Sequence, residues 1–125
     1  MMNKKEFEAV IKQPPNIRYE YFIKKVADFE EVWGLYNDGW VTAQDDEGKM
    51  LIPFFPKKEF AEFFANNEWL GCKAKPIDLD YFIDKWLTGM KEDGIKPSIF
   101  PTDEDTAVVN IDVLLNDLEA ELGNY

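Results

Sequence analysis

Carboxylates are the side chains of this sequence with the widest capacity for chemistry. The chain contains 25 Asp and Glu residues, and it groups some of them at Asp45–Glu47, at Asp78 and Asp80, and at Asp103–Asp105. Two carboxylates that face each other across a cleft can act as general acid and base. Several carboxylates around one point can bind a hard cation such as Ca²⁺.

Two of these groups have a structural explanation that we favour. Asp45–Glu47 stands directly before Gly48, in a segment typical of a hairpin turn, where acidic side chains accept hydrogen bonds from nearby backbone. Asp78 and Asp80 precede the clearest helical pattern in the chain, where carboxylates suit the capping position and the helix dipole.

The third group does not fit an EF-hand calcium loop. Counted from Asp103, the sixth and twelfth positions are Val108 and Leu114, where such a loop needs glycine and glutamate. Glu104 and Asp105 complete the group without supplying the missing residues. We therefore expect no metal centre and no cofactor.

Other familiar active sites are excluded by composition. The chain has no histidine and one cysteine, Cys72. A Ser-His-Asp triad, a histidine zinc site and an internal disulfide are therefore impossible. Lys73 could lower the pKa of the Cys72 thiol, but no second thiol can resolve an oxidised form, so we interpret Cys72 as structural. We expect a protein that is not an enzyme.

The charge of the chain points away from nucleic acid. The formal net charge is −11, and the only arginine is Arg18, whereas binding to phosphates relies on Lys and Arg. The apolar run at residues 50–55 is too short to cross a bilayer. We expect a cytoplasmic protein with neither nucleic acid nor membrane as a partner.

Acidic residues are concentrated near the C-terminal end. Residues 101–125 contain seven acidic residues and no basic ones. One interpretation is a solvated helix face that aids solubility. The other is a docking surface that steers a basic protein partner.

Apolar spacing predicts five helices. Asn3 can cap the first, which Pro14-Pro15 ends, and Asn16 can cap the second. A third is expected from Lys57 onward. A fourth begins after Asp78 and ends at Gly94, and a fifth begins after Asp112 and ends at Gly123. The apolar stripe of the second helix consists of Tyr19, Phe22, Ile23 and Val26, and that of the fourth of Leu79, Phe82, Ile83, Trp86, Leu87 and Met90.

Strand-forming segments lie between these helices. Residues 32–36, 40–44 and 49–54 are separated by short turns, which predicts an antiparallel meander. Further strands are expected at residues 69–77, 95–100 and 106–111, with Pro97 placing the second of these at a sheet edge or at a strand start. The order ααβββα(β)αββα predicts a single α+β domain over residues 1–125, with helices packed on an antiparallel or mixed sheet of about five strands.

Three segments carry a family resemblance. Residues 18–36 (RYEYFIKKVADFEEVWGLY), 45–56 (DDEGKMLIPFFP) and 77–102 (IDLDYFIDKWLTGMKEDGIKPSIFPT) together resemble the bacterial domain-of-unknown-function family 2750. The resemblance implies a small cytoplasmic bacterial protein and no particular activity. A weaker similarity of layout, over residues 46–65, is to the serine-sensitivity-enhancer type of domain.

Aromatic residues gather on or near the expected meander. They are Trp33, Tyr36, Trp40, Phe54, Phe55 and Trp69. Because successive side chains of a strand face opposite sides, one of Phe54 and Phe55 should point to the core, and so should one of Trp33 and Tyr36. The others are either covered by helices or exposed for binding.

These features support three functional hypotheses. The first is a non-catalytic binding module, inhibitor-like or immunity-like, that contacts a basic protein partner. Its surface would comprise Trp33, Tyr36, Trp40, Phe55, Trp69, Asp103, Glu104 and Asp105. The second is a small-molecule sensor with an aromatic-lined pocket between the sheet and the helix at residues 78–90. The third is an enzyme that relies on a buried Asp or Glu in a cleft.

Overall fold

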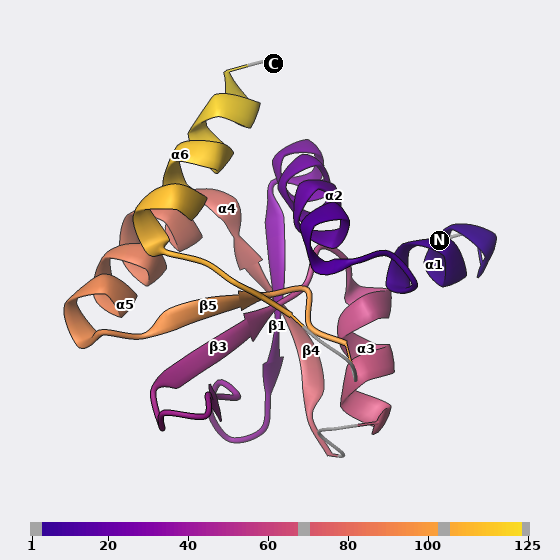
Figure 1. The fold of residues 1–125 in the computed structure, drawn as a ribbon, viewed down its shortest axis with the longest axis horizontal. Coiled ribbons are helices and arrows are strands. Elements are labelled where there is room, and N and C mark those ends of the chain that lie inside the picture. Colours follow the sequence, from indigo (N-terminus) through magenta and orange to yellow (C-terminus); the bar gives the residue numbers. More distant parts are fainter. Residues whose placement is uncertain (1–3, 68–70, 103–105, 124–125) are drawn as a thin grey trace.

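The helices lie close to where the apolar spacing predicts them. The computed structural model describes residues 4–67, 71–102 and 106–123. Its helical elements are α1 (Lys4–Ile11), α2 (Pro15–Phe29), α3 (Lys58–Asn67), α4 (Leu79–Tyr81), the π-helical turn η1 (Phe82–Trp86), α5 (Leu87–Asp93) and α6 (Ile111–Leu122). Figure 1 shows α2 and α6 on the same side of the strands, with α1 and α3 together at another side.

In the described residues, six short strands form two sheets. They are β1 (Glu31–Tyr36), β2 (Ala43–Gln44), β3 (Met50–Phe54), β4 (Lys73–Asp78), β5 (Lys96–Ile99) and β6 (Ala107–Val108). One sheet pairs β1 with β4, and the other has the order β2-β3-β5-β6. The β3–β5 pair is parallel and the others are antiparallel, so the fold is α+β with a mixed sheet, as predicted.

The predicted meander is only partly correct: β2 and β3 pair antiparallel, as predicted, but β1 does not join their sheet. All six residues of β1 pair with β4, the strand that the sequence places after the third helix. Within the part of the chain that the structure describes, the other edge of β1 makes two isolated bridges, from Tyr36 to Trp40 and from Trp33 to Phe55. The chain therefore leaves β1 directly after the turn, and the expected strand at residues 40–44 shortens to β2.

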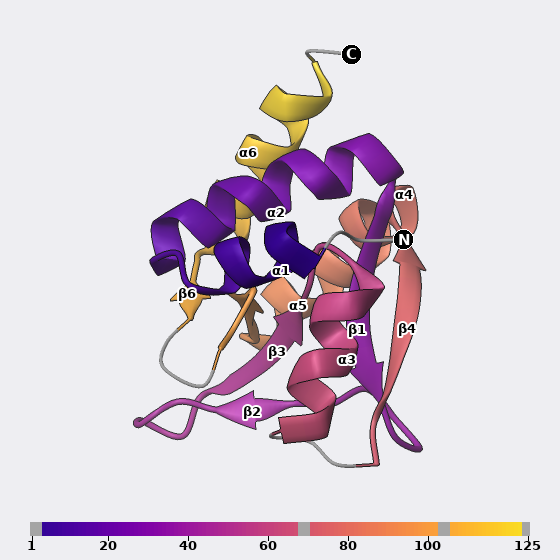
Figure 2. The same cartoon turned by 90° about the vertical axis from the view of Figure 1, so that its right-hand side faces the viewer.

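The two sheets meet at one of these bridges. The Trp33 amide donates to the Phe55 carbonyl at 2.9 Å, and the Phe55 amide donates to the Trp33 carbonyl at 2.7 Å. Phe54 and Phe55 are both fully buried, but they face different helices. Phe54 contacts Phe82, with ring centroids 4.9 Å apart, whereas Phe55 contacts Phe64 at 5.8 Å. As expected for neighbours in a strand, they point to opposite sides, and helices cover both sides. Figure 2 shows α3 in front of the strands and α2 above them.

Strand β5 lies inside its sheet. It is paired with β3 on one side and β6 on the other, so Pro97 stands near the strand start, as predicted, but not at an edge. The Pro97 carbonyl still accepts from the Val109 amide at 3.3 Å. The effect of the proline on the sheet is therefore limited to the hydrogen bond that its missing N–H cannot donate.

Two predicted helix caps are wrong. Helix α2 begins at Pro15, before Asn16, and its N-terminal cap is Pro14, without a side-chain hydrogen bond. Helix α6 is capped by Asn110, whose side chain accepts from the Asp112 amide at 2.7 Å, so Asp112 lies in the first turn. Proline is well suited to the first helical position because its missing N–H has no helical partner there. Asn3 lies outside the described residues.

The other helix signals are confirmed. The Asp78 side chain accepts from the Tyr81 amide, and Gly94 ends α5 in the left-handed conformation. Within this predicted helix, η1 adds a wider turn, in which the Leu87 amide donates to the Phe82 carbonyl.

Helix α2 is held by polar side chains in its first half. Arg18 is 2% exposed, and its guanidinium donates from Nε to the Phe100 carbonyl at 3.0 Å and from Nη1 to the Gln13 carbonyl at 2.6 Å. The Tyr21 hydroxyl donates to Glu6 of α1 at 2.7 Å, and Lys57 lies 3.5 Å from the same carboxylate. The hydrogen bond from Tyr21, aided by Lys57, lowers the pKa of Glu6.

We predict that Tyr21→Phe lowers the free energy of unfolding by about 1 kcal/mol at pH 7, because it removes a charge-assisted but partly solvated hydrogen bond. Since Glu6 has a lowered pKa when folded, its contribution is complete above its ordinary pKa of 4.5 and is lost as the pH falls below that value. The difference between the two proteins in urea denaturation should therefore shrink toward pH 3.

The matched control is Tyr81→Phe, at a tyrosine that is 57% exposed. A Tyr21→Phe deficit that stays constant between pH 7 and about pH 3 would show that Glu6 does not carry the effect.

Candidate functional site

Tyr36 and Trp40 form one half-buried aromatic group. Their ring centroids are 5.3 Å apart, and Trp40 lies 4.8 Å from Trp86 of η1, each pair in edge-to-face contact. The Lys75 ammonium lies 4.0 Å from the centroid of the Tyr36 ring. Gly34 makes room for this arrangement, because a Cβ atom there would lie 3.0 Å from the Trp40 ring. Tyr36 and Trp40 therefore pack mainly against the edge of the core, through Trp86, and contribute little to an open aromatic surface.

The predicted aromatic surface is divided. Trp33 is half-buried beside Phe29 and Lys57, apart from the Tyr36–Trp40 pair. The prediction that Phe55 belongs to a binding surface is wrong. The residue is fully buried, because α3 and Phe100 cover its ring. Trp69 lies outside the described residues.

The predicted pocket between the sheet and the helix at residues 78–90 is filled by side chains. Phe54 and Phe82 are fully buried in edge-to-face contact, and Trp86 lies 5.7 Å from Phe54. These interlocking rings occupy the space in which a ligand was expected.

The acidic groups have the structural roles that the sequence favours. Asp45 Oδ1 accepts from the amides of Glu47 and Lys49, at 2.9 and 2.8 Å, which closes the hairpin turn. Asp78 caps α4. Asp103, Glu104 and Asp105 lie outside the described residues. Across the described part of the chain, no three acidic or cysteine side chains converge as metal ligands.

A groove between α2 and α6 brings other carboxylates together. It has a volume of about 730 Å³. The apolar residues that line it are Pro15, Ile23, Ala107, Val109 and Ala120, and the polar ones are Asn16, Tyr19, Glu20, Lys24, Asp117 and Glu121. The charged residues in this lining are three carboxylates and one lysine. The groove therefore combines an apolar lining with net negative charge.

A hydrogen bond between helices joins the two walls of the groove. The Tyr19 hydroxyl donates to Asp117 Oδ2 at 2.6 Å, between residues 98 positions apart in the sequence. Burial raises the pKa of the Tyr19 hydroxyl, and the bond to Asp117 and the charge of this carboxylate raise it further. Tyr19 thus stays protonated and keeps α6 beside α2.

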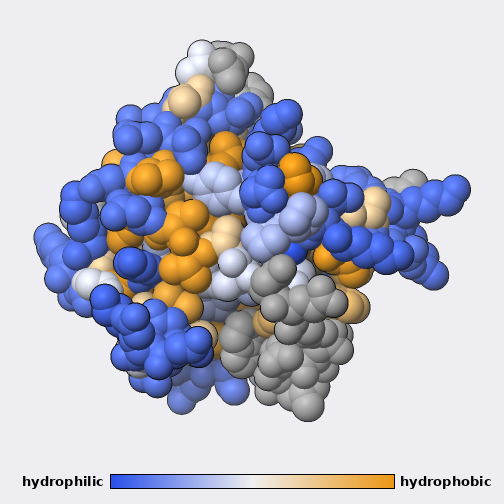
Figure 3. Space-filling view, in the orientation of Figure 1, coloured by the Kyte–Doolittle hydropathy of each residue, from blue (hydrophilic) through white to orange (hydrophobic). Residues whose placement is uncertain are grey.

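Strand β6 and helix α6 also expose apolar side chains. Val108 of β6 is 42% exposed, and Val113 of α6 is 49% exposed. Figure 3 shows hydrophobic residues gathered left of centre, where Figure 1 places α6, α5 and β5, with hydrophilic residues around them. An apolar area surrounded by hydrophilic residues has the composition of a surface that binds a partner.

No pattern in the sequence predicts this groove. Tyr19 appears in the sequence only as part of an apolar stripe, and Asp117 only as one of seven acidic residues near the end of the chain. The available signal is the Tyr19 hydroxyl itself, since a tyrosine in a buried stripe needs a hydrogen-bond partner.

We predict that Tyr19→Phe makes the protein less sensitive to alkali. A group with a raised pKa in the folded state contributes stability below its unfolded pKa, here 10, which is lost as the pH rises. Above pH 10, wild-type stability should fall relative to Tyr19→Phe by up to about 1.4 kcal/mol per pH unit. Urea denaturation at pH 7, 10 and 11, with Tyr81→Phe as the control, measures this. Parallel pH profiles for wild type and Tyr19→Phe would contradict the buried Tyr19–Asp117 bond.

Comparison with known proteins places the chain in a family. No curated protein matches it. As a separate finding from the structure, no helix in the described part of the chain is long and apolar enough to span a membrane. The model of a family described as "Protein of unknown function (DUF2750)" matches residues 19–121, which is most of the 125-residue chain. The resemblance predicted from three sequence segments is thereby confirmed, and the chain belongs to the DUF2750 family.

Proposed function

We propose that this protein is a non-catalytic binding module whose α2–α6 groove receives a basic, partly apolar segment of a protein partner. The observation that carries the proposal is the lining of the groove, with Glu20, Asp117 and Glu121 against Lys24 over an apolar lining. Carboxylates attract lysine and arginine side chains, and the apolar lining gives a site for the hydrophobic residues between them.

The net charge of the whole chain acts in the same direction. With a net charge of −11, the protein attracts a basic partner at long range, and the groove provides the site where that partner binds. Exposed charges interact weakly once salt screens them, so the association should depend on ionic strength. A small acidic protein that covers a basic surface in this way would act as an inhibitor or immunity protein.

The composition supports a role without catalysis. The chain has neither a histidine nor a second cysteine.

The proposal predicts that charge reversal in the groove abolishes binding. A tagged protein would be used to capture partners from the lysate of its own cells at low and high salt, read by mass spectrometry. We expect a basic partner that wild type retains at low salt and that Glu20→Lys/Glu121→Lys loses.

The matched control is Glu8→Lys/Glu62→Lys, at exposed positions of α1 and α3 that do not line the groove. Both double variants change the net charge from −11 by +4, to −7. Retention of the partner by the control alone supports the groove. Equal loss in both variants would show that overall charge, and not the groove, attracts the partner.

A further inference from the structure

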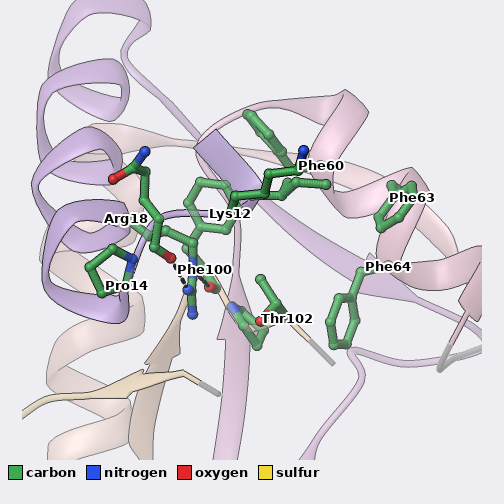
Figure 4. A pocket seen from close by; sticks show the side chains of 11 residues that line it. Lys12, Pro14, Arg18, Phe60, Phe63, Phe64, Phe100 and Thr102 are labelled. Atoms are coloured by element: carbon green, nitrogen blue, oxygen red, sulfur yellow. Dashed lines mark hydrogen bonds between the residues drawn. The ribbon is translucent and has the colours of Figure 1, made fainter. Parts of the chain in front are cut away.

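A second cavity lies on the other side of α2, where the α1–α2 turn meets α3. It has a volume of about 520 Å³, within the range of about 300–1,000 Å³ typical of small-molecule sites. The residues that line it are Ile11, Lys12, Gln13, Pro14, Arg18, Phe60, Phe63, Phe64, Phe100, Pro101 and Thr102. Figure 4 shows Arg18 on one side, Phe63 and Phe64 on the other, and Phe100 and Thr102 between them.

In its described lining, this cavity differs in charge from the protein as a whole. Its charged residues in the described lining are Lys12 and Arg18, both cationic, although acidic residues outnumber basic ones by 25 to 14 in the whole chain. Lys12 is exposed at the entrance, and it makes no ion pair within the described ranges. Arg18 is buried and is held by the carbonyls of Phe100 and Gln13.

Four phenylalanines give the cavity its apolar part. Phe60, Phe64 and Phe100 are buried, and the ring centroids of Phe60 and Phe100 are 4.6 Å apart. Phe63 is 43% exposed, although it belongs to α3 like Phe60 and Phe64. An exposed phenylalanine at the edge of such a cavity can cover the apolar body of a ligand.

The backbone of Phe100 is held in an unusual conformation at this place. Its φ is 51°, in the left-handed region that bulky residues rarely adopt. Hydrogen bonds fix it there: its amide donates to the Phe54 carbonyl at 2.8 Å, and its carbonyl accepts from Arg18. Such strain is typical of binding sites, where it fixes the position of a side chain.

We propose that this cavity binds a small organic anion, a carboxylate on an aromatic body. The carboxylate would lie toward Lys12 and Arg18, and the ring would lie against Phe63 and Phe100. The inference goes beyond the proposed function, because it concerns another face of α2 and a different class of ligand.

The test compares two probes of the same shape, 2-naphthoate and its neutral amide, 2-naphthamide. Each is titrated into isotopically labelled protein, and the shifts of the backbone amides are followed by NMR. We expect shifts at residues 11–13, 63 and 102, and binding of the acid about tenfold tighter than that of the amide.

Two variants separate the charge from the apolar contact. Lys12→Gln should reduce the preference for the acid about threefold, because an exposed charge contributes modestly. The control Lys49→Gln, at another exposed lysine, should leave it unchanged. Phe63→Ala should weaken binding of both probes equally, because it removes contact area and no charge.

Several results would overturn the proposal. They are affinity for the acid weaker than about 1 mM, equal affinity for acid and amide, shifts centred elsewhere on the protein, or an unchanged preference in Lys12→Gln. None of these results bears on the α2–α6 groove, so the two proposals succeed or fail separately.

Discussion

Among four consecutive residues of α2, Arg18 to Tyr21, three side chains make hydrogen bonds that join α2 to other parts of the chain. Arg18 binds the carbonyls of Gln13 and Phe100, Tyr19 binds Asp117 of α6, and Tyr21 binds Glu6 of α1. Burying a guanidinium is costly unless hydrogen bonds accompany it, so Arg18 fixes how α2 sits against the end of β5. The two cavities lie on either side of this helix, and each depends on these contacts for its walls.

The local part of this structure can be predicted from the sequence. Residues spaced as Phe22, Ile23 and Val26 must share a helix face, and a carboxylate such as Asp78 before an apolar stripe begins a helix. The sequence does not predict which strands pair. The turn at Asn37–Gly39 favours pairing of β1 with the next strand, yet that pairing stops at the Tyr36–Trp40 bridge, and the extended pairing of β1 is with β4, along its other edge. The outcome depends on long-range packing, which no local pattern records.

The same division explains the candidate sites. The acidic end of the chain and the aromatic cluster are visible in the sequence, but their exposure is not. Phe55 lies in the core because both α3 and Phe100 reach it, and Tyr36 and Trp40 pack toward Trp86. Conversely, the Tyr19–Asp117 contact spans 98 positions, and the Arg18–Phe100 contact spans 82. Sites built from such long-range contacts cannot be predicted from the spacing of residues along the sequence.

The central claim is that binding by this acidic protein is localised in the α2–α6 groove. It is tested most directly by NMR mapping of a short amphipathic peptide of lysine and leucine on the labelled protein. The account predicts shifts confined to residues such as Glu20, Ala107 and Glu121, which weaken as salt is added and are absent with a peptide of glutamate and leucine. Shifts spread over the acidic residues of α1 and α3 to the same extent would contradict it, because general charge would then account for the binding.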